Sequence, residues 1–335
     1  MEVPSVDPVL ETSSPCKWRL GREHQSEEEV MLLSPKFTQR SALLVLLFSS
    51  FVAPGISQTV PDRVFRDVDG KPLPFQTDAE AEAFLRAAEV TSQKNIGVGV
   101  TKPKQLVLEK DGLKVHAAFN YVDREGQREK LEDGSVEMYF LDSYKADIAT
   151  YKLSRLLDME MIPPGVERQV GDDVGVVRLW IEDLESYDEW IEEGNTGTPD
   201  SLYVQRQIKD QIVFDLLIRN TDRNRGNINW DPDENLWMID QTRSLARVAE
   251  LRDKEAKKFK GSSRALYEAM IALKASDVER ELGPYIGKFE IKALMKRRDK
   301  LVKLIDTEVK KKGEDEILFN YTDAPKGLVI DYGDE

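Results

Sequence analysis

The sequence predicts a two-lobed α+β fold, with a small β-rich N-terminal lobe followed by a mainly helical C-terminal lobe. Segments of β-forming residues separated by turn residues, with one strong amphipathic helix among them, run to about Leu184. Helical periodicity dominates from Thr198 onward. The chain has 335 residues, of which 40% are hydrophobic, and this is enough to fill a substantial core.

The places where these patterns change give the expected domain limits. An N-terminal extension covers residues 1–57, the N-terminal lobe 58–184, the C-terminal lobe 185–318 and a C-terminal tail 319–335. No internal repeat is visible along the chain.

The one long apolar run is SALLVLLFSSFVA, from Ser41 to Ala53. It is too short for a membrane-spanning helix, which needs about 20 apolar residues, and it fits the apolar region of a signal peptide. Initiation at Met31 would place Lys36 and Arg40 before it. We therefore expect a secreted, periplasmic or secretory-lumen protein with no stable membrane span after cleavage. If Met1 is the start, the run is a signal anchor or a buried segment, and without export the protein is cytoplasmic.

Charge and composition exclude several classes of function. A formal net charge of -14 repels nucleic-acid phosphates and anionic membranes, so no nucleic-acid partner is expected. Cys16 is the single cysteine, which rules out an intramolecular disulfide and a thiolate zinc site. The two histidines, His24 and His116, are far apart in sequence, and neither is near the acidic segment described below.

The N-terminal lobe begins with a helix over Thr77–Val90, which Thr77 or Asp78 caps. A β-hairpin follows, with its turn at KDG, Lys110–Gly112. The pattern then predicts an amphipathic helix with Asp142 as its capping residue, and two further strands before Leu184.

Long helices make up the C-terminal lobe. Thr198 as N-cap and Pro199 at the first helical position predict the start of the first one, which ends near Asn220. Further helical stretches cover Arg264–Lys274 and Lys288–Lys312. The apolar face of the first helix consists of Val204, Ile208, Ile212, Leu216 and Leu217.

The segment from Phe214 to Leu245 carries the residues best suited to catalysis and metal binding. Trp230 and Trp237 flank the turn-rich loop DPDEN, and pairing them across a hairpin sets Asn227 opposite Asp240. Asp222 lies in the loop just before this hairpin, within reach of the same place. Carboxylate and amide oxygens suit Mg²⁺ or Mn²⁺, hard ions that bind nucleotide phosphates.

These residues resemble the catalytic segment of an atypical kinase family. Asp222 followed five positions later by Asn227, and then the MID that ends at Asp240, is similar to HipA-type kinases, phosphoinositide kinases and secretory-pathway casein kinases. The resemblance implies ATP-dependent transfer of a γ-phosphoryl group to an unidentified hydroxyl-bearing substrate. Asp222 would be catalytic and orient the acceptor, while Asn227 and Asp240 would hold the metal. Arg223 falls on a variable position of that loop, and Asp215 is expected to brace it.

The same resemblance implies a set of nucleotide-binding residues. Gly97 and Gly99 would form the loop over the phosphates, and Asp147 would pair with the nucleotide-binding lysine. The strand VHAAFNYV, the second strand of the hairpin, carries Asn120 at the expected lysine position. The substitutes would be Lys102, Lys104 or Lys114, and the hinge strand that meets adenine would contain Leu179, Trp180, Ile181 and Glu182.

Plainer interpretations of these residues remain open at this point. The aspartates and asparagines of the motif favour ordinary turns, Asp147 could be a solvated acid, and Trp180 could belong to the core. The missing lysine also leaves open a pseudokinase-type module that binds a nucleotide or partner without catalysis. A third alternative keeps the fold but transfers a nucleotidyl group.

Overall fold

The N-terminal region contains a five-stranded antiparallel sheet, in agreement with the predicted β-rich lobe. The computed structural model describes residues 63–96, 103–130 and 136–323, all of which belong to one compact unit, Ile56–Glu335. The signal-peptide prediction and the C-terminal end of the predicted tail lie outside the described residues. The five strands have the order β1-β2-β3-β7-β6. They are β1 (Glu89–Asn95), β2 (Lys104–Lys110), β3 (Leu113–Asn120), β6 (Gly165–Val170) and β7 (Asp173–Leu179).

Local sequence determines the predicted hairpin between β2 and β3. Its pairing ends with Lys110 opposite Leu113. Asp111 and Gly112 both have positive φ, 52° and 80°, as a two-residue turn that matches the strand twist requires. The hairpin prediction is confirmed.

Helix α1 (Asp78–Ala87) packs on this sheet. Thr77, one of the two predicted caps, caps it in a reciprocal capping box with Glu80. The predicted end at Val90 is wrong, because the helix ends at Ala87 and β1 begins at Glu89. Ala81 and Leu85 on its inner face are fully buried. The Arg168 side chain on β6 donates to the carbonyl of Leu85 at 2.7 Å, which fixes the end of the helix against the sheet.

The ribbon formed by β4 (Asp123–Lys130) and β5 (Val136–Ser143) was not predicted. β5 leads directly into α2 (Tyr144–Leu156). The prediction of Asp142 as the helix cap is wrong, because the Ser143 hydroxyl accepts the Lys145 N–H at 3.1 Å and takes that role. Asp142 is the last strand residue but one, and its carboxylate is not used for capping.

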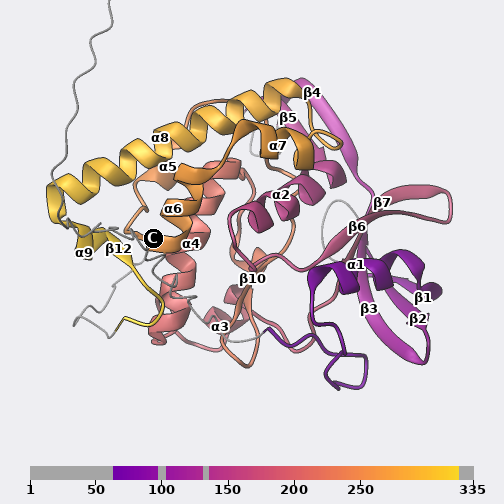
Figure 1. Cartoon of the computed structure of the whole chain (residues 1–335). Coiled ribbons are helices and arrows are strands. Elements are labelled where there is room, and N and C mark those ends of the chain that lie inside the picture. Colours follow the sequence, from indigo (N-terminus) through magenta and orange to yellow (C-terminus); the bar gives the residue numbers. More distant parts are fainter. Residues whose placement is uncertain (1–62, 97–102, 131–135, 324–335) are drawn as a thin grey trace, which may run out of the picture. The chain divides into compact units, whose positions relative to one another are not determined.

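The C-terminal region is mainly helical, as Figure 1 shows. Its central helix is α4 (Leu202–Ile218), and the prediction that Thr198 caps it is wrong, because the Ser201 hydroxyl accepts the Val204 N–H. Ser201 is as good a cap and lies directly before the apolar periodicity. The other helices are α3 (Tyr187–Glu192), η1 (Arg225–Asn227), α5 (Asp253–Ala256), α6 (Arg264–Ala272), α7 (Ala275–Leu282), α8 (Lys288–Lys312) and α9 (Glu314–Ile317).

Two small sheets complete the C-terminal region. One has the order β10-β9-β8, and the other pairs β11 with β12. In the described residues no helix is both long and apolar enough to span a bilayer. The strands are β8 (Glu185–Ser186), β9 (Ile228–Trp230), β10 (Leu236–Met238), β11 (Ser262–Ser263) and β12 (Leu318–Phe319).

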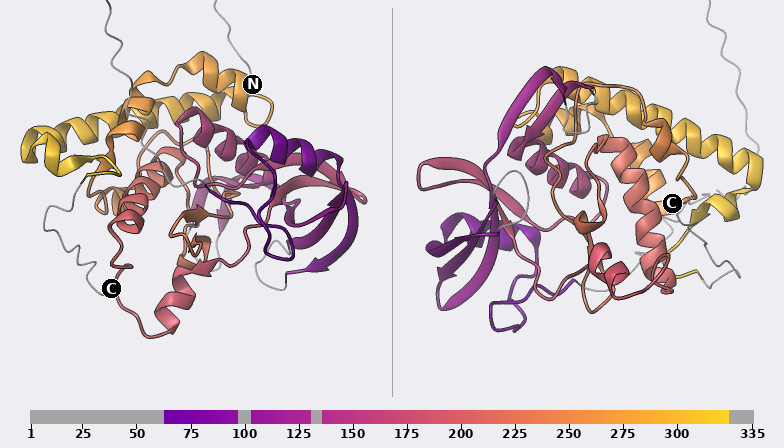
Figure 2. Two further views of the ribbon diagram at one scale, coloured as in Figure 1. Left: turned by 60° about the horizontal axis from the view of Figure 1, so that its bottom comes forward. Right: turned by 180° about the vertical axis from the view of Figure 1, so that it is seen from behind.

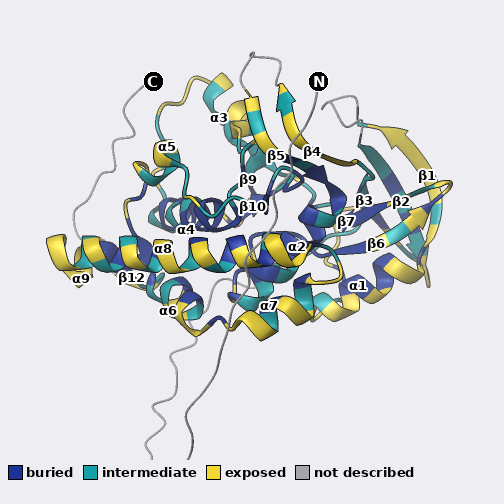
Figure 3. Ribbon diagram, turned by 90° about the horizontal axis from the view of Figure 1, so that it is seen from above, coloured by how far each residue is buried: buried dark blue, intermediate teal, exposed yellow. Residues whose placement is uncertain are grey.

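Two hydrophobic cores hold the two regions, and α2 connects them. One core lies between α1 and the five-stranded sheet, and the larger one surrounds α4. Tyr151 and Leu153 of α2 belong to the larger core, while α2 also contacts β6 and β7. Figure 3 shows α4 and the middle of the sheet as largely buried, with exposed residues along the outer side of α8. Figure 2 shows the β4–β5 ribbon beside the start of α8 and separate from the five-stranded sheet.

Close packing between β3 and β7 depends on Gly175. A Cβ placed there would lie 2.3 Å from the Asn120 carbonyl oxygen and 2.8 Å from the Tyr121 Cα, and both are backbone atoms. Gly175→Ala should therefore lower the free energy of unfolding by about 1 to 3 kcal/mol. Urea unfolding followed by circular dichroism measures this, with Gly126→Ala as the control, because that strand glycine has open space around it. Equal stability of both variants would contradict the close approach.

Candidate functional site

The loop that carries Asp222 is positioned by the end of α4. Arg219 caps the helix in the left-handed conformation, with φ 55°. The chain then turns so that the buried Asn220 accepts the Asp222 N–H on its side-chain oxygen at 2.8 Å. The Thr221 N–H donates to the Arg243 carbonyl at 3.0 Å. The backbone around Asp222 is thus tied both to the helix and to the segment after β10.

Arg223 clamps this loop to the two strands that follow. Its guanidinium forms a buried ion pair with Asp215, through Nε at 3.0 Å and Nη2 at 3.2 Å. Nη1 donates to the carbonyls of Asn227 at 2.9 Å and Ile239 at 2.8 Å, and Nη2 also donates to the Gln241 side chain. Asp215 therefore braces the loop as expected. The sequence placed Arg223 at a variable position of the loop. It did not predict that Arg223 joins the loop to both arms of the hairpin.

The predicted register of the β9–β10 hairpin is wrong by one residue. Trp230 pairs with Leu236 and not with Trp237. The cause is the loop, in which the Asp231 carboxylate accepts the N–H groups of Asp233 at 3.0 Å and Asn235 at 2.9 Å. This turn ends the loop one residue earlier than the aromatic pair suggested. A one-residue slip reverses the faces, so Trp237 packs against Phe65 while Trp230 joins the core around α4.

The metal-binding pair predicted from that register still lies close to the loop aspartate. Asn227 is opposite Ile239, and the Ile239 N–H donates to the Asn227 carbonyl at 3.3 Å. Asp240 comes one residue later with φ 56°, so the chain turns there. The Asn227 amide nitrogen lies 3.5 Å from the Asp222 carbonyl oxygen, which leaves its amide oxygen available for a cation.

Asp222, Asp240 and Asp142 are close enough for their negative charges to influence one another. Partial desolvation raises the pKa of Asp222, and the like charges of Asp240 and Asp142 raise it further. The Arg243 guanidinium opposes these effects. Such a group of mutually repelling carboxylates is costly for a fold and is typical of a site that binds a cation.

Asp142 is a member of this site that sequence reasoning missed, because a helix cap seemed to explain it. The backbone places it there, since the Ser143 N–H donates to the Thr242 carbonyl at 3.0 Å, two residues beyond Asp240. Asp142 is 8% exposed, and its Oδ1 has no hydrogen-bond partner among the described residues. Burial raises the pKa of its carboxyl, and Asp240 adds to that effect.

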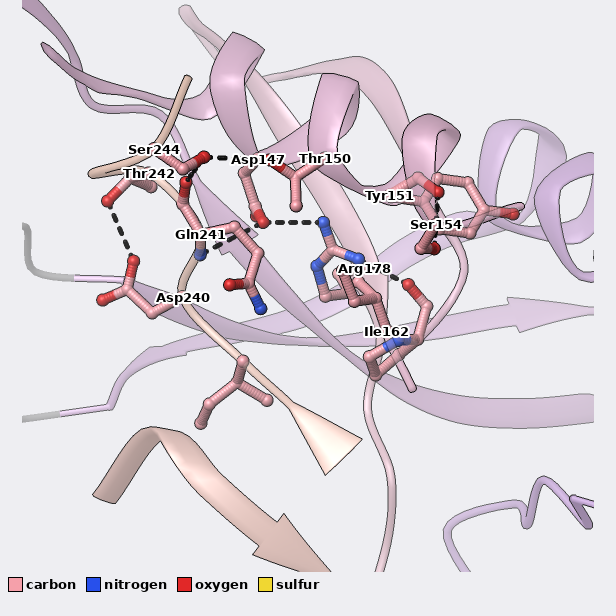
Figure 4. Close-up of polar contacts among 12 residues, drawn as sticks. Asp147, Thr150, Tyr151, Ser154, Ile162, Arg178, Asp240, Gln241, Thr242 and Ser244 are labelled. Atoms are coloured by element: carbon pink, nitrogen blue, oxygen red, sulfur yellow. Dashed lines mark hydrogen bonds and ion pairs between the residues drawn. The ribbon is translucent and has the colours of Figure 1, made fainter. Parts of the chain in front are cut away.

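Asp147 reaches the same segment from inside α2. Figure 4 shows its carboxylate between the Arg178 guanidinium and the Gln241 backbone, and the distances are 3.0 Å and 3.3 Å. Asp147 is 4% exposed, so the alternative of a solvated acid is wrong. Burial raises the pKa of the Asp147 carboxyl, while Arg178 acts in the opposite direction. Asp147 thereby fixes the residue that follows Asp240.

The comparisons with known proteins come from structure alone. The sequence matches no family model and no curated protein. The solved structure of hydra Fam20 with sugar is similar with a TM-score of 0.54 at 15% identity, covering 73% of this chain and 93% of that one. The Golgi casein kinase with Mn and ADP bound is similar with a TM-score of 0.52 at 12% identity, covering 72% of this chain and 78% of that one.

This chain has an atypical kinase-like fold. The predicted fold class is therefore confirmed, with its sheet-rich N-terminal and helical C-terminal regions. At these identities the comparisons establish the fold, and the chemistry has to be argued from the residues.

In this kinase-like fold, the predicted hinge follows β7. Ile181 is buried, and the Trp180 N–H donates to the His116 carbonyl at 3.1 Å. The Glu182 carboxylate lies 2.7 Å from His116 Nδ1, while Leu179 is a buried residue at the end of β7. The segment then enters β8, which pairs with β9. The predicted hinge segment is thus linked directly to the sheet that contains β9 and β10.

The predicted glycine loop joins β1 to β2. Gly97, Gly99 and Lys102 lie outside the described residues. On either side of them, the Ile96 N–H donates to the Pro103 carbonyl at 3.0 Å, so the connection closes between two antiparallel strands.

The candidate lysines that the structure describes are held in ion pairs near the ends of strands β2 and β3. Lys104 lies 3.6 Å from Asp173, and Lys114 lies 3.3 Å from Glu109. Asn120 is the β3 residue expected to be lysine, and its side chain accepts the Val122 N–H at 3.1 Å. The cation that pairs with Asp147 is Arg178 on β7, and not Lys104 or Lys114.

The residues present fit a hard divalent cation that also binds phosphate. Within the described ranges no group of three or more His, Cys, Asp or Glu side chains forms a ready-made metal cage. Mg²⁺ and Mn²⁺ sites in nucleotide-binding proteins typically use one or two carboxylates, with phosphates and water completing the shell. Asp240, Asn227 and the unpaired oxygen of Asp142 provide that kind of donor set.

Asp142 gives a test of this site that does not depend on catalysis. Asp142→Asn removes a buried charge that Asp240 repels, so the metal-free variant should melt higher than wild type by about 2 to 4 °C. The same variant should lose most of the rise in melting temperature that Mn²⁺ causes in wild type. Differential scanning fluorimetry with EDTA and then with Mn²⁺ measures both effects.

The control is Asp123→Asn, at the start of the neighbouring strand. Burial acts to raise the pKa of Asp123, but the Lys145 ion pair at 2.6 Å and the Ser143 hydroxyl that donates to Asp123 together lower that pKa. Its substitution should lower the melting temperature and leave the Mn²⁺ response intact. A lower melting temperature for Asp142→Asn together with a normal Mn²⁺ response would reject the metal assignment of Asp142.

Proposed function

We propose that this protein is an ATP-dependent phosphotransferase that moves a γ-phosphoryl group to a hydroxyl acceptor with the help of Mg²⁺ or Mn²⁺. The observation that carries the proposal is that Asp222 and Asn227 lie on one short loop, and that Asp240 and Asp142 are near enough for their charges to raise the pKa of Asp222. These residues come from a helix-to-strand loop, the turn after β10 and the end of β5. The kinase-like fold supports the proposal, because its solved relatives include a Golgi casein kinase with Mn and ADP bound.

Each residue has a role that follows from its position. Asp222 lies on a loop held by Arg223, and its raised pKa suits a group that orients an acceptor hydroxyl and receives its proton. Asp240 and Asn227 would hold the metal on the side of the phosphates, and Asp142 would add a further oxygen. Bound metal would neutralise charge on the phosphates. Asp147 positions Asp240 through the Gln241 N–H.

The alternative is a pseudokinase-type module that binds a nucleotide or partner in the same place. It is favoured by Asn120, which puts a neutral side chain where the resemblance implies a lysine. A module of this kind would gain stability from ATP with Mn²⁺ but form no ADP. Measuring both quantities on one sample separates the two functions, and mass spectrometry of the product separates phosphoryl from nucleotidyl transfer.

The acceptor class and the location belong to the same proposal. Acceptor loops vary widely on one fold, so these residues define the substrate only as a hydroxyl compound. We expect the protein outside the cytosol, on the basis of the apolar segment 41–53. The N-terminal residue of the mature protein tests this expectation, and a chain that still begins at Met1 in the cytosol would contradict it.

The roles of Asp222 and Asp240 predict how substitutions change turnover. Asp222→Asn and Asp240→Asn should each lower ATP-dependent phosphorylation by about 10²-fold or more, while both variants remain folded. Transfer of radiolabelled phosphate to the protein itself, together with ADP release, measures this. Asp233→Asn is the matched control, because this aspartate lies exposed in the loop of the same hairpin and should leave turnover unchanged. Equal activity in all four proteins would reject the assigned roles.

A further inference from the structure

A phosphotransferase of this fold needs a cation at the transferring phosphate, and the β3 strand does not provide one. Arg178 is committed to the buried Asp147 and to the Pro163 carbonyl. Lys104 and Lys114, near the ends of β2 and β3, form ion pairs with Asp173 and Glu109. Lys102 lies outside the described residues, and within them another element carries a candidate cation for the phosphate.

Arg243 has the required position in the chain. It follows Asp240 by three residues, and its carbonyl accepts both the N–H of Thr221 at 3.0 Å and the Thr221 hydroxyl at 3.3 Å. Thr221 directly precedes Asp222. The backbone of Arg243 is thus fixed next to the residue proposed to orient the acceptor.

The side chain of Arg243 is held in place by the β4–β5 ribbon. Nη2 forms an ion pair with the Glu137 carboxylate, and the guanidinium carbon lies 4.7 Å from the centre of the Phe140 ring. The side chain is 16% exposed, and Nε is buried without a hydrogen-bond partner in the part of the chain that the structure describes. The result is a guanidinium that its neighbours hold in one orientation.

Its charge acts on both sides of the proposed reaction. Arg243 is the cation with the largest effect on the Asp222 carboxyl, and it also acts on Asp142. Asp142 belongs to the metal side and Asp222 to the acceptor side.

We propose that Arg243 contacts the γ-phosphate of the bound nucleotide and supplies the cation that β3 lacks, with Glu137 as its positioning residue. This inference rests on the phosphotransferase function proposed above. In the transfer, the bond from the γ-phosphorus to the β–γ bridging oxygen breaks, and a bond to the acceptor oxygen forms. The acceptor proton goes to Asp222, ADP carries away the bridging oxygen, and the guanidinium offsets charge on the oxygens of the moving group.

The test compares nucleotides with and without the γ-phosphate. Isothermal titration with Mn²⁺ and AMP-PNP, and separately with Mn²⁺ and ADP, is applied to wild type and Arg243→Gln. We expect Arg243→Gln to weaken AMP-PNP binding by about tenfold or more, because charge-assisted hydrogen bonds to phosphate are lost, and to leave ADP binding within about twofold. Arg243→Lys keeps the charge without the planar fork, so its loss should be intermediate.

Arg247→Gln is the matched control, because this neighbouring arginine pairs with Glu290 at 2.8 Å and is 37% exposed. It should bind both nucleotides as wild type does. Glu137→Gln should lower kcat with little change in the affinity for ADP. If Arg243→Gln and Arg243→Lys keep the wild-type preference for AMP-PNP over ADP, or lose both affinities equally, the inference is overturned while the phosphotransferase proposal stands. If wild type binds neither nucleotide, both proposals fall.

Discussion

The site depends on holding like charges close together, which the fold achieves against their mutual repulsion. Asp142, Asp222 and Asp240 come from three different segments, and burial and neighbouring charges raise the pKa of both Asp142 and Asp222. Such an arrangement persists only when the surrounding structure fixes the backbone of each segment. The Arg223 clamp joins the loop of Asp222 to both hairpin arms, and the Asp147 carboxylate holds the backbone just after Asp240.

The same restraints explain why the site spans both regions of the molecule. Asp147 and Arg178 form a buried pair between α2 and β7, so the carboxylate that positions Asp240 is itself held by the N-terminal sheet. On the other side, the β4–β5 ribbon contributes Asp142 and also Glu137, the ion-pair partner of Arg243. A change in how α2 lies on the sheet would therefore be transmitted to the segment after Asp240, because Ser143, Asp147 and Thr150 all form hydrogen bonds with residues 241–244. The polar ribbon, which contributes little to the cores, is best understood as a support for the charged groups.

Local signals in the sequence were sufficient for much of the fold and for part of the site. The capping box at Thr77 and the turn at Gly112 were predictable because neighbours in sequence determine them. The spacing of Asp222 and Asn227 placed both residues on one loop for the same reason, and the catalytic role of that loop stays a prediction. The hairpin register was not predictable from its tryptophans, because the Asp231 side chain decides where the loop closes. Asp142 and Arg178 were missed since their roles arise only from partners far away in the chain.

The central claim is that these oxygen-bearing side chains bind one divalent cation together with a nucleotide. The most direct measurement is anomalous X-ray scattering from Mn²⁺ in crystals grown with Mn²⁺ and ADP. We expect an anomalous peak within coordination distance of an Asp240 carboxylate oxygen and of the Asn227 or Asp142 side-chain oxygen, at about 2.0 to 2.3 Å. A peak confined to other surface carboxylates, or ADP bound with no peak near Asp240, would contradict it.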